Sequence, residues 1–281
     1  MQHASPVPRL VPWSAPDGTR LFARIWNTAG EPAGRVVYLH GILSHGGWFS
    51  ASCRKLVEEG QEVHFLDRRG SGLNWQERGD VPGVNAWLND VDAYLAKLPR
   101  DCPRTLVGVS WGGKLAAAVA ARSPGCIDRL ALLYPGLYSQ IEPAGWKRWL
   151  LAAAARAGLG HCRVQIPLSE PSQFTFDVAR QAFIARDPLA LRTVTVRFLQ
   201  AHLALDEHIA QAAERIRVPT LVMLAGRDRI VDNARVTRFY DKITTSDKRL
   251  IEYPSAAHTL EFEPHPQPFL KDLAEWIGRK G

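Results

Sequence analysis

Short apolar runs recur along the chain and alternate with segments whose apolar residues have helical spacing. The runs lie at residues 35–39, 62–66, 105–109, 130–133, 220–224 and 249–253, and the helical segments at 48–59, 84–98, 115–122, from about 233, and 267–280. Strands that are nearly continuous in apolar residues are buried on both faces. The pattern therefore predicts an α/β fold, a mostly parallel central sheet with helices on both faces. Residues 21–26 alternate instead, which predicts an edge strand.

The alternation of predicted strands and helices stops in the middle of the chain. From about residue 135 to residue 217 the sequence is helical in pattern, bears tryptophans and is broken by prolines, and no strand–helix unit is evident. The sheet pattern resumes at Thr220. We interpret residues 1–281 as a single domain into which residues 135–217 are inserted as a helical cap.

Composition and charge exclude several classes of protein. A hydrophobic fraction of 46% and a charged fraction of 22% are typical of an ordinary globular protein. The formal charge of +7 is spread over scattered arginines and lysines, so we expect a solvated surface and no nucleic-acid partner. We expect no signal peptide, since the N-terminus lacks an apolar segment, and the run 149–155 is too short to span a bilayer. With four cysteines that show neither metal-ligand nor disulfide-framework spacing, these features predict a cytoplasmic protein.

The most informative motif is Gly-Val-Ser-Trp-Gly at residues 108–112. It lies between an apolar run and an alanine-rich helical segment, the strand–turn–helix context that a nucleophile elbow requires. The turn holds its serine in a strained conformation, so Gly108 and Gly112 meet a demand for positions without bulk. Chance alone would produce the bare motif in roughly one chain of this length in ten. Its flanks, and a matching base and acid elsewhere, decide whether Ser110 is a nucleophile.

Candidates for the base and the acid follow the last two predicted strands. Asp228 comes after the run 220–224 and His258 after the run 249–253, and the carboxyl ends of parallel strands meet at one edge of a sheet. A serine needs a base, which a third group must orient, and these two residues could supply both roles. Asp232 is an alternative acid on the same loop, and Asp228 could instead be a surface ion pair. His265 is an alternative base, although it lies between prolines and further from the strand end.

Taken together, these motifs resemble those of the α/β-hydrolase superfamily. The resemblance is strongest to its monoacylglycerol lipase and lysophospholipase-like serine hydrolases, of the serine aminopeptidase S33 type. It rests on the order of Ser110, Asp228 and His258, the elbow, His40-Gly41, and the segment 67–72 (Asp-Arg-Arg-Gly-Ser-Gly). The resemblance covers nearly the whole chain outside the cap.

The resemblance implies an α/β-hydrolase fold and a role for each matching residue. Ser110 would attack the substrate carbonyl, His258 would accept its proton, and Asp228 would orient the imidazole. The backbone N–H groups of Ile42 and Trp111 would form the oxyanion hole. His40, Asp67 and Arg68 are interpreted as loop and strand-end scaffolding, and His45 as shaping the pocket mouth or capping the next helix. No metal cluster or phosphate-binding loop is visible, so we expect no cofactor and no metal.

The implied activity is hydrolysis of a small acyl ester, with a monoacylglycerol or lysophospholipid as the favoured substrate. The same three side chains could serve an aminopeptidase, a thioesterase or a C–C hydrolase, and the fold could also be that of a non-catalytic binding protein. An aminopeptidase needs an acid in the cap that binds the substrate amine, and the available candidates are Glu142, Glu170 and Asp177. The sequence does not indicate an oligomeric state.

Two sets of cap residues bear on the substrate. Tryptophans and leucines stand beside lysine and arginine at 146–156, a pattern that could rest on a membrane surface, although a helix packed on the core explains it better. A hydrophobic pocket is expected beneath the cap. Four phenylalanines could line it or pack between helices, namely Phe174, Phe176, Phe183 and Phe198.

Overall fold

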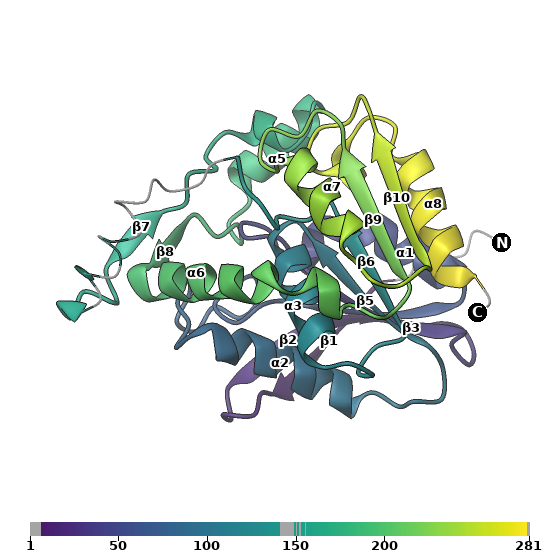
Figure 1. The fold of residues 1–281 in the computed structure, drawn as a ribbon, viewed down its shortest axis with the longest axis horizontal. Helices are drawn as coiled ribbons and strands as arrows, with labels where there is room; N and C mark the ends of the chain where they lie inside the picture. The colour runs from purple at the N-terminus through teal and green to yellow at the C-terminus, as the bar shows by residue number, and fades with distance from the viewer. Residues whose placement is uncertain (1–6, 141–148, 150, 152, 155, 280–281) are drawn as a thin grey trace.

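An eight-stranded sheet forms the centre of the computed structural model, which describes residues 7–140, 149, 151, 153–154 and 156–279. The strand order is β1-β2-β4-β3-β5-β6-β9-β10 (Figure 1). The strands from β4 across to β10 run parallel, and β1 and β2 are antiparallel to their neighbours. The bounds are β1 Arg9–Ser14, β2 Arg20–Trp26, β3 Gly34–Leu39, β4 Gln61–Leu66, β5 Arg104–Val109, β6 Arg129–Leu133, β9 Thr220–Ala225 and β10 Lys248–Tyr253. The predicted α/β class with a mostly parallel sheet is confirmed.

The prediction that residues 21–26 form an edge strand is wrong. They belong to β2, which pairs with β1 on one side and with β4 on the other. The edge is β1, which contains Pro12 and is largely exposed. A proline removes one ladder hydrogen bond and is tolerated at an edge. Its apolar residues stand next to one another around Pro12 and do not alternate with polar ones, so β1 did not show as a strand in the sequence pattern.

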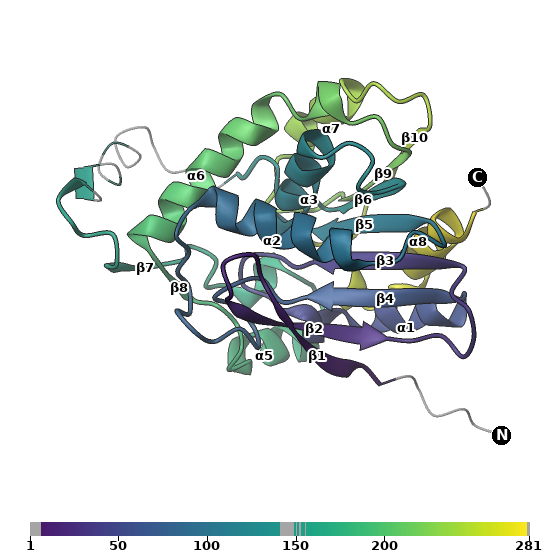
Figure 2. The same cartoon turned by 90° about the horizontal axis from the view of Figure 1, so that it is seen from below.

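Helices cover both faces of the sheet, as predicted. Helices α1 and α8 pack together on one face, and α2 and α3 pack together on the other (Figure 2). The bounds are α1 Ser50–Glu58, α2 Val84–Lys97, α3 Trp111–Arg122, α7 Asn233–Asp241 and α8 Gln267–Gly278. Every residue of β3, β5, β6 and β9 is buried between these layers, which explains why these strands read as apolar runs. No described helix is long and apolar enough to cross a membrane.

The segment between β6 and β9 carries its own secondary structure. It contains α5 Val178–Arg186, α6 Val196–Ala210, the 3₁₀ turns η2 Pro171–Gln173 and η3 Ala213–Arg215, and the strands β7 Arg163–Gln165 and β8 Thr193–Thr195. Helix α6 packs against α2 and α3, while β7 projects away from the sheet (Figure 1). The segment contains helices, as the sequence pattern predicts, and in addition β7 and β8 form a small antiparallel sheet that the pattern did not indicate. With three residues each, they are too short to show a strand pattern.

Most of the tryptophan-bearing stretch 146–156 lies outside the described residues, as does Glu142. The four cysteines lie within them, and all four are free thiols, as the sequence predicts. The parallel strands bring their carboxyl ends to a common edge of the sheet. There, His40 follows β3, Asp67 follows β4, and Ser110 follows β5. This edge holds the candidate site.

Candidate active site

Ser110 occupies a strained turn between β5 and α3. Its backbone angles are φ 52° and ψ −122°, in the region of positive φ that residues other than glycine rarely adopt. Three backbone hydrogen bonds hold it there: Ser110 N–H donates to Leu133 O at 3.0 Å, and Ser110 O accepts from the N–H groups of Gly113 at 2.8 Å and Gly136 at 2.7 Å. Such strain persists only where the surroundings over-determine the conformation, and it is concentrated at functional sites.

The two glycines of the motif are needed because the backbone is crowded. A Cβ atom on Gly108 would lie 2.5 Å from the carbonyl oxygen of Gly112. A Cβ atom on Gly112 would lie 2.2 Å from the carbonyl oxygen of Leu39, in the neighbouring strand β3. Both distances are too short for any side chain. The spacing of glycines around Ser110 therefore follows from how closely α3 approaches β5 and β3.

His258 contacts Ser110 on one side and Asp228 on the other. Its Nε2 atom lies 2.8 Å from Ser110 Oγ, and its Nδ1 atom lies 2.7 Å from Asp228 Oδ2. The second carboxylate oxygen of Asp228 accepts the backbone N–H groups of Ile230 at 2.8 Å and Val231 at 2.9 Å. Since a carboxylate so held only accepts, Nδ1 carries the imidazole proton and Nε2 is free to accept the proton of the Ser110 hydroxyl.

The alternative acid and base lie elsewhere. Asp232 is the N-cap of α7, where its carboxylate accepts the N–H of Arg235 at 3.0 Å. His265 is exposed to solvent. The side chain of Asp228 is fully buried and faces His258, so it is not a surface ion pair. The structure thus brings together the three residues that sequence reasoning placed first.

The loop after β3 lies directly beside Ser110. A Cβ atom on Gly41 would be 3.3 Å from Ser110 Cβ and 3.6 Å from Ser110 Oγ, so Ile42 begins next to the hydroxyl. Trp111, the first residue of α3, follows Ser110 in the chain. Within the described part of the chain, neither the Ile42 N–H nor the Trp111 N–H donates to a protein acceptor. Two backbone donors are therefore available next to Ser110, one of them at a helix N-terminus.

His40 holds this loop in the way the sequence suggests. Its Nε2 atom accepts the backbone N–H of Arg68 at 2.8 Å, so the proton is on Nδ1, which donates to Gly41 O at 2.7 Å. Burial and the nearby Arg68 charge lower the pKa of His40 to about 3. The imidazole is therefore neutral at physiological pH, and His40 connects the loops that follow β3 and β4.

Asp67 is a structural carboxylate, as expected. It accepts Arg24 Nη1 at 2.5 Å and the backbone N–H groups of Gly46 at 2.7 Å and Leu73 at 2.8 Å. Burial alone would raise the pKa of Asp67, but the charge of Arg24 and these hydrogen bonds hold it below its usual value. Asp67 thus joins β2 to the loops that follow β3 and β4.

His45 caps the turn that follows it, which is one of the two roles that the sequence offered for it. Its Nδ1 atom accepts the Gly47 N–H at 3.0 Å and caps the turn η1 Gly46–Phe49. Its Nε2 atom lies 3.0 Å from Asp187 Oδ2, which also accepts Trp48 Nε1 at 2.5 Å. Asp187 comes from the end of α5, so this contact fastens the inserted segment to the loop beside the site. Sequence reasoning missed Asp187, since nothing marks it among the other acids.

Trp111 also joins the elbow to the inserted segment. Its Nε1 atom donates to His202 Nδ1 of α6 at 2.9 Å, and one turn further along α3 Lys114 pairs with Asp206. The Trp111 ring lies edge-on to that of Trp87, with centroids 4.8 Å apart. Helix α6 is therefore fixed on α3, the helix that begins directly after Ser110.

The four phenylalanines differ in environment. Phe198 is fully buried and packs against Trp87. Phe174 lies edge-on to the His258 ring at 6.0 Å, and its carbonyl accepts the N–H of Thr259 at 2.7 Å. Phe176 and Phe183 are partly exposed. Phe174 and Phe198 therefore both lie against residues of the candidate site, Phe174 against His258 and Phe198 against Trp111 at 6.4 Å between ring centroids.

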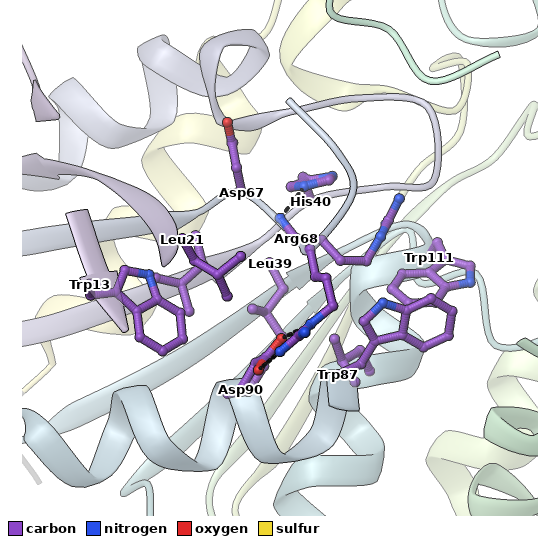
Figure 3. Close-up of a pocket in the computed structure, with 13 residues that line it drawn as sticks. Trp13, Leu21, Leu39, His40, Asp67, Arg68, Trp87, Asp90 and Trp111 are labelled. Carbon is purple, nitrogen blue, oxygen red and sulfur yellow. Dashed lines mark hydrogen bonds and ion pairs between the residues drawn. The ribbon is translucent and has the colours of Figure 1, made fainter. Parts of the chain in front are cut away.

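A small cavity lies behind the site, on the α2 side (Figure 3). Its volume is about 20 Å³, enough for a water molecule and too small for a substrate. Its lining includes Arg68, Trp87, Trp111, His40 and Trp13. Within the described residues, no group of three or more histidine, cysteine or acidic side chains could hold a metal ion.

Comparison with known proteins identifies a family match. The family model described as "Serine aminopeptidase, S33" matches residues 30–265. That span contains Ser110, Asp228 and His258, together with the whole inserted segment.

Individual relatives and solved structures extend the match to nearly the whole chain. A monoacylglycerol lipase of Mycolicibacterium smegmatis is 25% identical over 268 residues, which cover 92% of this chain and 93% of that protein. The human monoglyceride lipase is 26% identical over 270 residues, covering 91% of this chain and 88% of that protein. The crystal structure of a soluble variant of monoglyceride lipase from Saccharomyces cerevisiae, in complex with a substrate analog, superposes with a TM-score of 0.87 at 20% identity, covering 100% of this chain and 98% of that one. The last comparison shows that the fold is shared.

Proposed function

The chain belongs to the serine aminopeptidase S33 family, and from this membership we propose that it is a serine hydrolase that cleaves carboxylic esters. The observation that carries the proposal is the double contact of His258, at 2.8 Å to Ser110 Oγ and at 2.7 Å to Asp228 Oδ2. A serine, a base and an orienting acid in this order of contacts are what nucleophilic catalysis by a hydroxyl requires.

In the first half-reaction, Ser110 Oγ attacks the ester carbonyl carbon while His258 Nε2 takes the hydroxyl proton. Asp228 holds the imidazole tautomer and stabilises the imidazolium that forms. The carbonyl oxygen becomes an oxyanion, which accepts the N–H groups of Ile42 and Trp111. Loss of one such donor typically lowers the rate about 100- to 1000-fold. His258 then gives its proton to the departing alcohol, leaving an acyl group on Ser110.

In the second half-reaction, water attacks the acyl-enzyme. His258 Nε2 takes a proton from the water, the oxyanion forms again at the same two N–H groups, and Ser110 leaves as the hydroxyl when His258 returns the proton. The products are a carboxylic acid and an alcohol. No redox step and no cofactor enter this sequence.

We propose residues 135–217 as a cap over this site. Three contacts with the core support it: Asp187 with His45, His202 with Trp111, and the Phe174 carbonyl with the Thr259 N–H. All three core partners lie in loops or at a helix start beside Ser110. Contact of the cap with a membrane surface stays a prediction, because most of residues 146–156 lie outside the described part of the chain.

A small acyl ester such as a monoacylglycerol is the substrate class we propose, and a lysophospholipid shares its chemistry. The relatives from Mycolicibacterium smegmatis and human carry the names monoacylglycerol lipase and monoglyceride lipase. The surroundings of His258 are apolar and aromatic, with Phe174 at 6.0 Å and Tyr134 at 5.1 Å between ring centroids. Apolar and aromatic surroundings of this kind suit an acyl chain better than a charged group.

Aminopeptidase activity, which the family description names, is less well supported. The carboxylate of Asp177 accepts the N–H of Arg180 at 3.0 Å and caps α5, and Glu170 is exposed. Asp187 and Asp206 are already paired with His45 and Lys114. Asp177, Asp187 and Asp206 are thus engaged elsewhere, and within the described part of the chain Glu170 makes no hydrogen bond or ion pair with Ser110 or His258.

A panel of model substrates tests this assignment. We expect the protein to hydrolyse nitrophenyl esters and 1-monoacylglycerols with kcat/KM rising from acetyl to medium or long acyl chains. We expect no turnover of aminoacyl nitroanilides. The matched control is Ser110→Ala, which keeps the fold and lacks the nucleophile. Turnover of the anilides alone would replace the esterase assignment with an aminopeptidase.

A further inference from the structure

Arg68 is a buried cation beside the elbow with no carboxylate partner in the described part of the chain. Its exposed fraction is 8%, and the neighbouring carboxylate, Asp67, contacts Arg24 instead. Burial lowers the pKa of Arg68 to about 9, so the guanidinium is still protonated at neutral pH. A buried and unpaired charge costs several kcal/mol, whereas an apolar side chain of similar size would fill the space without that penalty. Packing alone therefore does not account for an arginine here.

The guanidinium reaches the loop that carries Ile42. Nη1 lies 3.3 Å from Gly41 O, and Nη2 lies 3.0 Å from Ile42 O. Nη2 also donates to Ser71 Oγ at 2.7 Å, and this third hydrogen bond fixes the plane of the guanidinium group. The carbonyl of Gly41 and the N–H of Ile42 belong to one trans peptide, in which the two bonds point in opposite directions. Holding the carbonyl oxygen on the Arg68 side therefore aims the Ile42 N–H away from Arg68.

The same carbonyl has a second donor, His40 Nδ1, at 2.7 Å. Two donors on one oxygen, one of them cationic, withdraw electron density from the peptide and make its N–H a stronger donor. Arg68 thus affects both the direction and the strength of the Ile42 N–H.

The other oxyanion-hole residue also touches this guanidinium. Arg68 Cζ lies 4.5 Å from the ring centroid of Trp111, and both side chains are seen in Figure 3. The same atom lies 5.4 Å from the ring centroid of Phe198. The stack fixes the Trp111 side chain from one side, and His202 fixes it from the other. One buried cation therefore contacts the residues that supply both proposed backbone donors.

We propose that Arg68 is a positioning residue that aligns and polarises the oxyanion hole. This inference rests on the proposed function, because it gives the N–H groups of Ile42 and Trp111 a negative charge to bind. Arg68 touches neither the substrate nor Ser110 in this account. It acts through the peptide between Gly41 and Ile42 and through the Trp111 ring. Its charge adds a positive potential next to the oxyanion.

A trifluoromethyl ketone with an acyl chain is the probe for this role. Ser110 Oγ adds to its carbonyl carbon, the hydroxyl proton goes to His258, and the carbonyl oxygen becomes an alkoxide in the oxyanion hole. The bond to the trifluoromethyl carbon does not break, so the hemiketal accumulates as a stable copy of the first intermediate. Its inhibition constant, and the apparent pKa of its oxygen followed by ¹³C NMR on labelled ketone, report on the oxyanion hole directly.

The variants are Arg68→Met, which removes the charge, and Arg68→Lys, which keeps the charge and loses the two-carbonyl fork and the flat stack. For Arg68→Met we expect kcat to fall about 10- to 100-fold with little change in KM, less than the loss of a direct oxyanion-hole donor costs, and the inhibition constant to rise by the same factor. The hemiketal oxygen should titrate at higher pH. For Arg68→Lys, kcat and the inhibition constant should lie between those of wild type and Arg68→Met. Because Arg68→Lys keeps the charge, it tests the positioning role if Arg68→Met does not fold.

The matched control is Arg104→Met. Arg104 is also buried, and it donates to Leu95 O at 3.2 Å from the amino end of β5, far from the carboxyl ends that carry the site. We expect this variant to lower Tm and leave the inhibition constant unchanged. If the Arg68 variants lower only Tm and leave the inhibition constant and hemiketal titration at wild-type values, the positioning role is wrong while the proposed function stands. If wild type forms no hemiketal, both the positioning role of Arg68 and the proposed serine hydrolase function are wrong.

Discussion

The Nε2 atom of His258 lies 2.8 Å from the Oγ atom of Ser110, although 148 positions separate the two residues in the chain. The contact exists because β5 and β10 end at the same edge of a parallel sheet. The strained turn at Ser110 and the loop after β10 then bring the two side chains within hydrogen-bonding distance. Asp228 follows β9, the strand next to β10, and its carboxylate contacts His258 Nδ1.

Replacement of Asp228 by asparagine should disable the site without unfolding the protein. An amide in this place can donate to Nδ1, which favours the tautomer whose proton sits on Nε2 and cannot accept from Ser110. We expect kcat on a nitrophenyl ester to fall about 10⁴-fold, with a circular dichroism spectrum like that of wild type.

Asp232→Ala is the control for this variant. Asp232 lies on the same loop but caps α7, so its loss should lower the free energy of unfolding by about 1 kcal/mol and leave kcat near the wild-type value. Equal loss of activity in both variants would show that the loop as a whole matters and that Asp228 has no special role.

Replacement of Gly112 by alanine should damage both fold and activity. The new Cβ atom would lie 2.2 Å from Leu39 O, a backbone atom of a central strand that cannot move freely. We expect a loss of about 1–3 kcal/mol in the free energy of unfolding, measured in urea, and a large drop in kcat, because α3 and Ser110 must shift. Gly30→Ala is the control, since a Cβ atom there meets nothing within 4 Å. A Gly112→Ala protein with wild-type stability would contradict the packing described here.

Glu261 should make stability depend on pH. Its buried carboxylate accepts the N–H groups of Ala51 at 2.7 Å and Ser52 at 3.2 Å at the start of α1, yet burial dominates and raises its pKa from 4.5 to about 7. The folded state therefore holds the proton more tightly than the unfolded state. The stabilisation is fully present below pH 4.5 and is lost as the pH rises through 7.

The test compares wild type with Glu261→Gln, which keeps an acceptor for these N–H groups and cannot ionise. Between pH 4.5 and pH 8 the free energy of unfolding of wild type should fall relative to that of the variant by about 3 kcal/mol. Glu252→Gln, at an exposed site in β10, should show no such difference. Parallel curves for wild type and Glu261→Gln would mean that Glu261 titrates alike in the folded and unfolded states.

The sheet and the three central site residues could be predicted from the sequence for one physical reason. Parallel strands buried on both faces read as apolar runs, and their carboxyl ends point to the same edge. Ser110, Asp228 and His258 could therefore be placed together from their positions after three such runs. The glycines around Ser110 marked the turn itself, because no other residue fits next to Leu39 and Gly113.

Features that depend on partners from distant segments could not be predicted. The edge strand β1 carries Pro12 and little buried surface, and β7 and β8 are too short to show a period. The pairing of His45 with Asp187 joins residues 142 positions apart and has no local signal. Arg68 could be interpreted only as scaffolding, since nothing in the sequence shows that its charge lies buried against Trp111 without a carboxylate partner among the described residues.

The measurement that tests the central claim most directly is labelling of the full chain with a fluorophosphonate probe, followed by mass spectrometry of the peptides. The account predicts rapid incorporation of one phosphonyl group per chain at Ser110, slower incorporation in His258→Ala, and none in Ser110→Ala, which should also lose about 10⁶-fold in kcat. An unlabelled wild-type protein, or a label that persists in Ser110→Ala, would contradict the claim that Ser110 is an activated nucleophile.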